Sequence, residues 1–357
     1  MKKYAFILLL LNLSLLSSAQ EKKVRLLFAG DAMQHRAQLE AAKTKDGYDY
    51  SSYFQHVKKQ IEKADIAIVN LEVTLGGKPY SGYPAFSAPD EFAQELKNAG
   101  FDIFLTANNH CLDKGKKGLE RTILMLDSLR IRHLGTYKNQ AQRNFRYPMM
   151  LKKNGIRIAL LNYTYGTNDI KVQSPNIVNY IDKKQILQDI DMAKCMYADV
   201  IIANIHWGEE YRLNQNKGQK ELAEFLIKNG VNIIIGGHPH VVQPIDIRKE
   251  NGRIKQVIAY SMGNFVSNMT APNTDGGMMV EFEISKNEKD SVEINNCGYS
   301  LVWVHKPVES GRKIFQLVPV KNYEEETKGT EFLGTEAYGR MMKFARKAKE
   351  TVEKMWQ

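Results

Sequence analysis

Short apolar runs alternate with amphipathic stretches along most of the chain. The apolar, β-branched runs predict buried strands over residues 24–28, 66–69, 103–105, 156–161, 200–205, 231–235 and 257–260. Apolar residues at helical spacing predict helices over residues 53–63, 89–98, 117–129, 183–197 and 218–228. Continuous apolar strands separated by helices are typical of an α/β fold whose sheets are covered on their faces.

The pattern changes after Gly276. Strand-like stretches follow one another without helices, and we expect them to complete a second sheet; they cover residues 278–284, 291–294, 301–305 and 314–320. From Glu331 the apolar positions alternate at spacings of three and four, which predicts a basic amphipathic helix over residues 331–357. A helix that closes over its own domain is favoured over a membrane or partner helix. We expect one large domain over residues 20–330, followed by this helix.

The first twenty residues have the pattern of a secretory signal. Lys2 and Lys3 precede an apolar run, and the run ends in small residues at Ser17-Ser18-Ala19, as a signal peptidase requires. The run is shorter than the roughly 20 residues that a helix needs to span a bilayer. We therefore expect residues 1–19 to be removed and the protein to be exported, to the periplasm or outside the cell, without a transmembrane span.

Composition narrows the classes of function. Of the 357 residues, 43% are hydrophobic and 25% are charged, which excludes a disordered chain, a coiled coil and a disulfide-framework miniprotein. The net charge is +10, but the chain has neither the Arg-rich arm nor the basic-aromatic alternation of a nucleic-acid surface. The three Cys are too few for a paired Cys-x-x-Cys zinc site. The charge therefore indicates a solvated surface that attracts acidic partners and not nucleic acid.

Polar residues follow the predicted strands at the points where the strands end. They are Asp31, Glu72, Asn109, His110, His206, His238 and His240. A single Asp or Asn after a strand is often a turn starter, and a lone His is more often structural than a ligand. Five strand ends of this kind are harder to attribute to turns. Because the loops beyond the carboxyl ends of parallel strands form the ligand crevice, we expect these side chains to converge.

Two carboxylates, one amide oxygen and three imidazoles suit one or two divalent transition ions (zinc, manganese or iron) better than calcium. Glu72 is the natural ligand to share between two ions, and such a pair can activate water for attack on phosphorus. Gly236 and Gly237 are expected to let the backbone bend, so that His238 and His240 face different ions. His110 is a candidate general acid, or alternatively a side chain that only hydrogen-bonds a ligand.

These residues resemble a known family. The motifs are Gly-Asp-x-Met, Asn-Leu-Glu, Ala-Asn-Asn-His, His-Trp-Gly-x-Glu-Tyr, Gly-His-Pro-His and Tyr-Ser-x-Gly-Asn-Phe. They resemble the CapA-type poly-γ-glutamate capsule-synthesis proteins (PGA_cap), within the calcineurin-like metallophosphoesterase superfamily. The resemblance implies a four-layer α-β-β-α sandwich and a dinuclear site with His110 near the leaving group. It implies the following ligands: Asp31 and His240 for one ion, Asn109, His206 and His238 for the other, and Glu72 as the bridge.

The sequence departs from the superfamily at the first motif. Where the superfamily has Asp-x-His, this chain has Asp31-Ala32-Met33, and a thioether is a poor ligand for such ions. His35 is the nearest replacement. Occupancy by one ion or by two fits the sequence equally. Glu210 and Asn264 lie in the matching motifs and are candidates for substrate contact, although Asn264 could equally fix a loop.

The leading hypothesis is an exported metal-dependent hydrolase of the phosphoesterase type. The resemblance attaches it to capsule or other envelope-polymer biosynthesis, so that its partner is an anionic polymer or a phosphoester. One alternative is a polymer-binding scaffold that retains the fold without turnover, which Met33 favours. The other is a metal-dependent amide hydrolase, because a metal-activated hydroxide also attacks carbonyl carbon.

Overall fold

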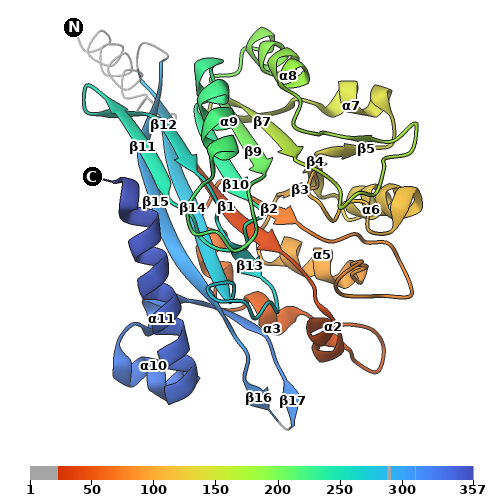
Figure 1. Ribbon diagram of the computed structural model, residues 1–357, viewed down its shortest axis with the longest axis vertical. Helices are drawn as coiled ribbons and strands as arrows, with labels where there is room; N and C mark the ends of the chain where they lie inside the picture. The colour runs from red at the N-terminus through yellow and green to blue at the C-terminus, as the bar shows by residue number, and fades with distance from the viewer. Residues whose placement is uncertain (1–22, 288–290, 310, 357) are drawn as a thin grey trace, which may run out of the picture.

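A computed structural model describes residues 23–287, 291–309 and 311–356 of the chain (Figure 1). The predicted signal segment, residues 1–19, lies outside the described residues. Fourteen of the described strands form one sheet, whose main path runs β4-β3-β2-β1-β14-β15-β12-β10-β9-β7-β6, and the other four form two two-stranded sheets. On one side of this path the strands are β4 (Arg132–Leu134), β3 (Ile103–Leu105), β2 (Ile66–Leu71) and β1 (Lys23–Ala32). On the other side they are β12 (Arg253–Ala259), β10 (Ile233–Gly237), β9 (Val200–His206), β7 (Ile156–Thr164) and β6 (Met149–Lys153).

The predicted strands of the tail join the two halves of the sheet. The strand β14 (Gly276–Lys286) runs antiparallel to β1, and β15 (Val292–His305) pairs with β14 along its length and with β12 at one residue pair, Ile254 and Ile294. The expectation that the tail completes a separate second sheet is therefore corrected, since hydrogen bonding is continuous from one half to the other. The predicted strands over 291–294 and 301–305 are two parts of the single strand β15.

The two halves pack face to face. Side chains alternate between the faces of a strand, and on β1 the residues Val24, Leu26 and Phe28 belong to a core shared with β7, β9 and β10. The intervening Leu27 and Ala29 belong to a second core, on the outer face of this half. The chain therefore has a sandwich of two sheet layers with an apolar core between them.

Helices cover both outer faces. The first half is covered by α3 (Ser51–Phe54), α4 (Lys58–Ile61), α5 (Asp90–Asn98) and the end of α6 (Gly115–Ser128). The second half is covered by α8 (Lys183–Cys195) and α9 (Lys217–Lys228). The predicted helix over 53–63 is thus two short helices. The layer order is helix, sheet, sheet, helix, as predicted.

The remaining elements are short or lie at the edges. They are α2 (Arg36–Ala42), β5 (Thr136–Tyr137), α7 (Gln140–Arg146), β8 (Ile177–Val178), β11 (Ile245–Glu250), β13 (Asn264–Val266), β16 (Val308–Glu309), β17 (Arg312–Lys313) and β18 (Gln316–Pro319). Two 3-10 turns cover Val320–Tyr323 and Glu353–Met355. β13 pairs with β1 and places Asn264 level with Asp31.

The C-terminal segment folds as two helices, α10 (Glu326–Leu333) and α11 (Thr335–Val352). Gly334 separates them with a φ of 79°, a backbone conformation that glycine adopts without strain and that interrupts the single helix expected from residue 331. The predicted apolar stripe of α11 is buried at Met341, Ala345 and Ala348 in the main core, and the helix lies along β15 (Figure 1). None of the helices in the described part of the chain has the length and hydrophobicity that crossing a bilayer requires.

Truncation of Phe28 tests whether the core between the two sheet layers holds the fold together. Phe28 is fully buried and packs edge-on against Phe282, so we expect Phe28→Ala to lower the free energy of unfolding by about 3–5 kcal/mol. Phe145→Ala is the matched control, because Phe145 is 89% exposed, and it should change stability by less than about 0.5 kcal/mol. Urea unfolding of both variants provides the measurement, and equal losses would contradict this assignment of the core.

Candidate metal centre

The polar strand ends meet at one edge of the sandwich. Asp31 lies near the end of β1 and Glu72 directly follows β2, so both come from the first sheet layer. His206 ends β9, and the loop after β10 carries His238 and His240, so the imidazoles come from the second layer.

The parallel register of neighbouring strands brings their ends level within each layer, since Asp31 is paired with Asn70 and His206 with Gly237. Asn109 and His110 lie in the turn after β3. All seven predicted side chains are buried.

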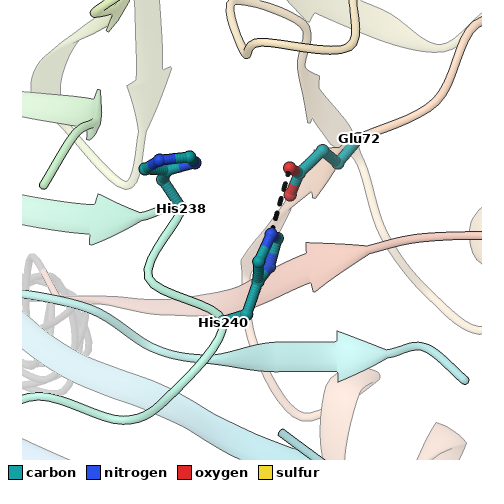
Figure 2. A group of neighbouring side chains, drawn as sticks. All are labelled: Glu72, His238 and His240. Carbon is teal, nitrogen blue, oxygen red and sulfur yellow. Dashed lines mark ion pairs between the residues drawn. The ribbon is translucent and has the colours of Figure 1, made fainter. Parts of the chain in front are cut away.

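The donor atoms form two groups that share one carboxylate. Glu72, His238 and His240 form the first group, and Asp31, Glu72 and His206 form the second; within each group the donor atoms lie within 4.8 Å of one another. Figure 2 shows Glu72 and His240 pointing toward each other, and the His240 Nε2 to Glu72 Oε1 distance is 3.8 Å. Glu72 Oε1 also lies 3.5 Å from His206 Nε2. Glu72 is thus common to both donor groups, and its role as a ligand shared between two ions stays a prediction.

Asn109 extends the second group. Its Oδ1 lies 2.9 Å from Nε2 of His206, and its Nδ2 donates to Asn168 Oδ1 at 3.2 Å. The amide oxygen is therefore turned toward the imidazole and the amide nitrogen away from it. The resemblance places His206 with His238 around one ion, whereas the donor groups place His206 with Asp31. Both arrangements share Glu72.

The carboxylate of Glu72 provides the test of fit for a cation. Both of its oxygens are buried, and neither accepts a hydrogen bond from a described residue. Nδ1 of His238 is likewise buried without a partner. An unpaired buried carboxylate is costly unless a cation or a proton neutralises it. Oxygen and imidazole donors around it are the ligands that divalent transition ions take, so these residues fit such an ion.

Burial and mutual charge shift the titration of the acidic groups and of His240. Burial, together with the neighbouring charge of Asp31, raises the pKa of Glu72 well above its ordinary value. Burial alone would raise the pKa of Asp31, but the hydrogen bond to His240 and the charges of His206 and His240 outweigh it and lower that pKa. Burial opposes protonation of His240, yet Glu72 and Asp31 raise the pKa of His240 to about 9.

The two other imidazoles shift in the opposite direction. Burial lowers the pKa of His206 to about 3, and burial together with the charges of His206 and His240 lowers the pKa of His238 to about 2. Neutral imidazoles are the form that ligates metals. Because the raised pKa values of Glu72 and His240 favour their protonated forms, protons compete with a cation for these groups, and affinity should fall as the pH falls.

The turn around His238 and His240 corrects the role expected for the two glycines before it. His238 and His240 themselves adopt left-handed φ values of 99° and 58°. Gly236 and Gly237 remain in β10 and are needed for close approach. A Cβ on Gly236 would lie 1.9 Å from the carbonyl oxygen of Tyr260, and one on Gly237 would lie 2.7 Å from Oδ1 of Asp31. The glycines make room for the carboxylate, and the histidines make the bend.

His110 is held by a carboxylate that the sequence analysis missed. Its Nδ1 lies 2.8 Å from Oδ2 of Asp113, and the same carboxylate oxygen accepts the backbone N–H of Phe86 at 2.7 Å. The ring of Phe86 packs edge-on against the imidazole, with 4.7 Å between ring centroids. Because Asp113 engages Nδ1, Nε2 of His110 is left for another partner. The signal was the spacing of three residues from His110 to Asp113 within one turn.

Two asparagines that the sequence analysis did not single out orient the acidic side. Nδ2 of Asn70 donates to Oδ1 of Asp31 at 2.8 Å, and Nδ2 of Asn108 donates to Oδ1 of Asn70 at 3.1 Å. Both residues stand beside predicted ligands in the Asn-Leu-Glu and Asn-Asn-His motifs, which was the available signal. Tyr165 was also missed. Its ring lies 4.5 Å from that of His238, and it is 47% exposed.

Asn264 is buried beside the centre, whereas Glu210 is exposed. Asn264 is fully buried; its Oδ1 lies 3.1 Å from Nδ1 of His240, and its Nδ2 donates to the carbonyl oxygen of Thr274 at 2.9 Å. These contacts are those of a residue that orients His240. Glu210 is exposed in the turn after β9; its negative charge weakly opposes the lowering of the pKa of His206 and adds to the raising of the pKa of His240. Substrate contact by either residue stays a prediction.

The first-motif segment contributes no imidazole to the two donor groups. Met33 is buried in the apolar core on the outer face of the first layer. Nδ1 of His35 accepts the backbone N–H of Asn268 at 3.2 Å, and its ring packs against Phe86. His35 belongs to neither donor group found among the described residues.

Comparison with known proteins decides the family. The family model of the bacterial capsule synthesis protein PGA_cap matches residues 25–269, more than half of the chain. This chain belongs to the PGA_cap family. The resemblance seen in the sequence motifs is thereby confirmed.

Two curated relatives of this PGA_cap chain are each 30% identical to it over 281 residues. Capsule biosynthesis protein CapA of Bacillus anthracis is matched over 75% of this chain and 66% of its own length. PGA biosynthesis protein CapA of Bacillus subtilis (strain 168) is matched over 75% of this chain and 69% of its own length. The chain thus spans about two thirds of the length of these relatives.

A solved structure supports the fold. A Staphylococcus aureus protein assigned as a 5′-nucleotidase superposes with a TM-score of 0.52 at 13% sequence identity, over 91% of this chain and 58% of that one. At this identity the likeness concerns the fold alone. It confirms the metallophosphoesterase-like sandwich predicted from the sequence.

Replacing Glu72 by Gln should separate two effects of the buried carboxylate: the stability that its charge costs the metal-free protein, and the stability that the protein gains when the carboxylate binds a metal. The pKa of Glu72 is higher in the folded protein than in the unfolded chain. The metal-free protein therefore loses stability as the pH rises above the pKa that Glu72 has in the unfolded chain. At pH 8 without metal, Glu72→Gln should therefore melt about 2–4 °C above the wild type. Added Mn²⁺ should raise the melting temperature of the wild type but hardly that of the variant.

Thermal melts with and without Mn²⁺ provide the measurement, with Glu331→Gln on exposed α10 as the matched control. The control should behave as the wild type in both conditions. A Glu72→Gln protein that gains as much from Mn²⁺ as the wild type would show that this carboxylate is not a ligand.

Proposed function

We propose that this protein is an exported, metal-dependent hydrolase of the phosphoesterase type that acts in the biosynthesis of capsule or of another anionic envelope polymer. The observation that carries the proposal is the buried carboxylate of Glu72, which has no hydrogen-bond donor among the described residues and is common to both donor groups. The secretion-like residues 1–19 support export, and the names of the two CapA relatives support capsule polymer as the context.

We propose that divalent transition ions, manganese, zinc or iron, are held by the six predicted ligands with Glu72 shared. Following the order of the family motifs, Asp31 and His240 serve one ion. Asn109, His206 and His238 serve the other. The chemistry that such ions supply when bound is Lewis-acid polarisation of a phosphoryl oxygen and activation of water.

The protein's own residues supply the proton and the orientation. In the protonated imidazolium of His110, Nδ1–H donates to Asp113 and Nε2–H is left to face the substrate. His110 passes the Nε2 proton to the leaving-group oxygen as the ester bond breaks and is left as the neutral imidazole. Asn264 orients His240, and Asn70 orients Asp31. Half-exposed Tyr165 forms a wall beside His238 against which a substrate can pack.

A scaffold that binds the polymer without turnover is the second candidate. One observation favours it: Met33 stands at the position of the superfamily's imidazole, and its side chain is buried in the apolar core. A protein with a single occupied metal position and no turnover would fit that observation.

Turnover and metal content together separate the candidates. We expect the purified protein to contain at least one divalent transition ion per chain and to hydrolyse a chromogenic phosphodiester. Glu72→Ala and His238→Ala should lower kcat/KM by about 10³-fold or more, because they remove charge stabilisation worth several kcal/mol. Glu331→Ala, on the exposed face of α10, is the control. Full activity in both site variants would end the proposal.

The same assay run with a γ-glutamyl amide identifies the other outcomes. Turnover of the amide without turnover of the diester identifies an amide hydrolase. Bound metal without turnover of either substrate supports the scaffold.

The role of His110 as general acid predicts a dependence on the leaving group. His110→Asn should lower kcat for an alkyl phosphoester by about 10²–10⁴-fold, because an alkoxide needs protonation as it leaves. It should lower kcat far less for a nitrophenyl ester, whose leaving group is stable as an anion. Asp113→Asn should also lower kcat more for the alkyl ester than for the nitrophenyl ester, but by a smaller factor than His110→Asn. Equal losses on both substrates would show that His110 acts in another way.

A further inference from the structure

A second pocket lies outside the metal centre, between the segment that follows β13 and the C-terminal helix. It has a volume of about 350 Å³. Its walls are the loop over residues 269–275, Lys306 just after β15, and the face of α11 that carries Arg340, Lys343 and Phe344. A volume of this size falls within the range of small-ligand sites.

The pocket has three cationic side chains and one carboxylate. Lys306, Arg340 and Lys343 line it together with Asp275, and Oδ2 of Asp275 already accepts the indole N–H of Trp303 at 2.8 Å. In the part of the chain that the structure describes, none of the three cations forms an ion pair. Asp275 is the acidic residue among the described lining residues, and it favours the charged form of Lys306 without forming an ion pair with it.

Two of these cations lie over aromatic rings. The guanidinium of Arg340 lies 5.8 Å from the ring centroid of Trp303, and Nζ of Lys306 lies 6.0 Å from that of Phe315. Cation–π contacts leave the N–H donors free to bind a ligand. The pocket thus presents positioned donors, and Arg340 adds a planar fork that matches carboxylate or phosphate geometry.

Holding these charges together has an electrostatic cost. Burial and, to a smaller extent, the positive charges of Lys313 and Arg340 lower the pKa of Lys306 to about 8, although the negative charge of Asp275 opposes the shift. An anion inside the pocket would relieve this repulsion and favour the charged form of the lysine.

The wall of the pocket is also connected to the metal centre. Nδ2 of Asn264 donates to the carbonyl oxygen of Thr274 and contacts Sδ of Met269, and Oδ1 of the same side chain lies beside Nδ1 of His240. One asparagine therefore links the loop over 269–275 to a predicted metal ligand. A ligand seated in the pocket would lie against the segment that orients His240.

We propose that this pocket binds an extended oxyanionic ligand, one that presents two or more carboxylate or phosphate groups to Lys306, Arg340 and Lys343. The identification of that ligand with a segment of the anionic polymer rests on the proposed function. The three cations come from two elements, the segment just after β15 and α11, and line one pocket, so a ligand with several charges can engage them together.

The test removes two of the cations and compares the result with an equal change elsewhere on the same helix. Arg340→Gln/Lys343→Gln alters the pocket, and Arg346→Gln/Lys347→Gln, also on exposed positions of α11, removes the same charge outside it. Fluorescence anisotropy of a labelled γ-linked pentaglutamate is measured with the Mn²⁺-loaded protein. We expect the pocket variant to bind about tenfold more weakly than the wild type and the control to change less than threefold.

A second probe distinguishes the source of the oxyanion. The stabilisation given by inorganic phosphate is followed by thermal melts of the same three proteins. Loss of peptide binding alone in the pocket variant identifies carboxylate as the ligand group, and loss of phosphate stabilisation alone identifies phosphate. Equal behaviour of the pocket and control variants toward both probes would overturn the proposal.

Metal content and turnover of the chromogenic phosphodiester, measured on the same preparations, keep the two proposals apart. If the protein is inactive but its binding of pentaglutamate depends on Arg340 and Lys343, the pocket proposal stands and the hydrolase proposal fails. If the protein is active but its binding of pentaglutamate does not depend on these residues, the hydrolase proposal stands and the pocket proposal fails.

Discussion

The carboxylate of Glu72 is the constraint on which the rest of the site depends. It is fully buried, and no described residue donates a hydrogen bond to it, so its charge has to be balanced by a cation or a proton. The imidazoles around it come from the second sheet layer, whereas Glu72 and Asp31 come from the first. The site therefore exists only while the two layers stay packed, and the apolar core between them serves the chemistry as well as the stability.

The tail of the chain sets how the layers meet. β14 pairs with β1 from Met279 to Ser285, and β15 continues the hydrogen bonding across to β12. The helix α11 then buries Met341 and Ala345 against the main core. These elements carry none of the predicted metal ligands, but they hold in place the strands that do. The helix α11 also contributes Arg340 and Lys343 to the pocket beside the loop over 269–275.

Much of the architecture could be predicted because the spacing of apolar residues, and the polar residues that end a strand, can be recognised within short stretches of the sequence. The run over 200–205 predicts a strand that the structure extends by one residue, to His206, and the polar groups after β1, β2, β9 and β10 converge because parallel strands end at one edge. Long-range contacts gave no comparable signal. Asn70 donates to Asp31 across 39 residues of sequence, through geometry that depends on the pairing of β1 with β2. The continuity of the sheet through β15 was likewise missed. The apolar pattern of a segment predicts that it is a strand, but it does not identify the distant strand with which it pairs.

The amino-acid sequence by itself determined which kinds of donor are available, after which strands they come, and the family to which the motifs point, because residue type and periodicity are properties of short segments. The tertiary structure alone decided which donor faces which. It set the left-handed turn at His238 and His240 and the burial of Met33 away from the donors. It also brought Lys306 and Arg340 to one pocket. The direction of a side chain depends on strand register and on packing between segments far apart in the chain, and these are settled only when the whole core forms.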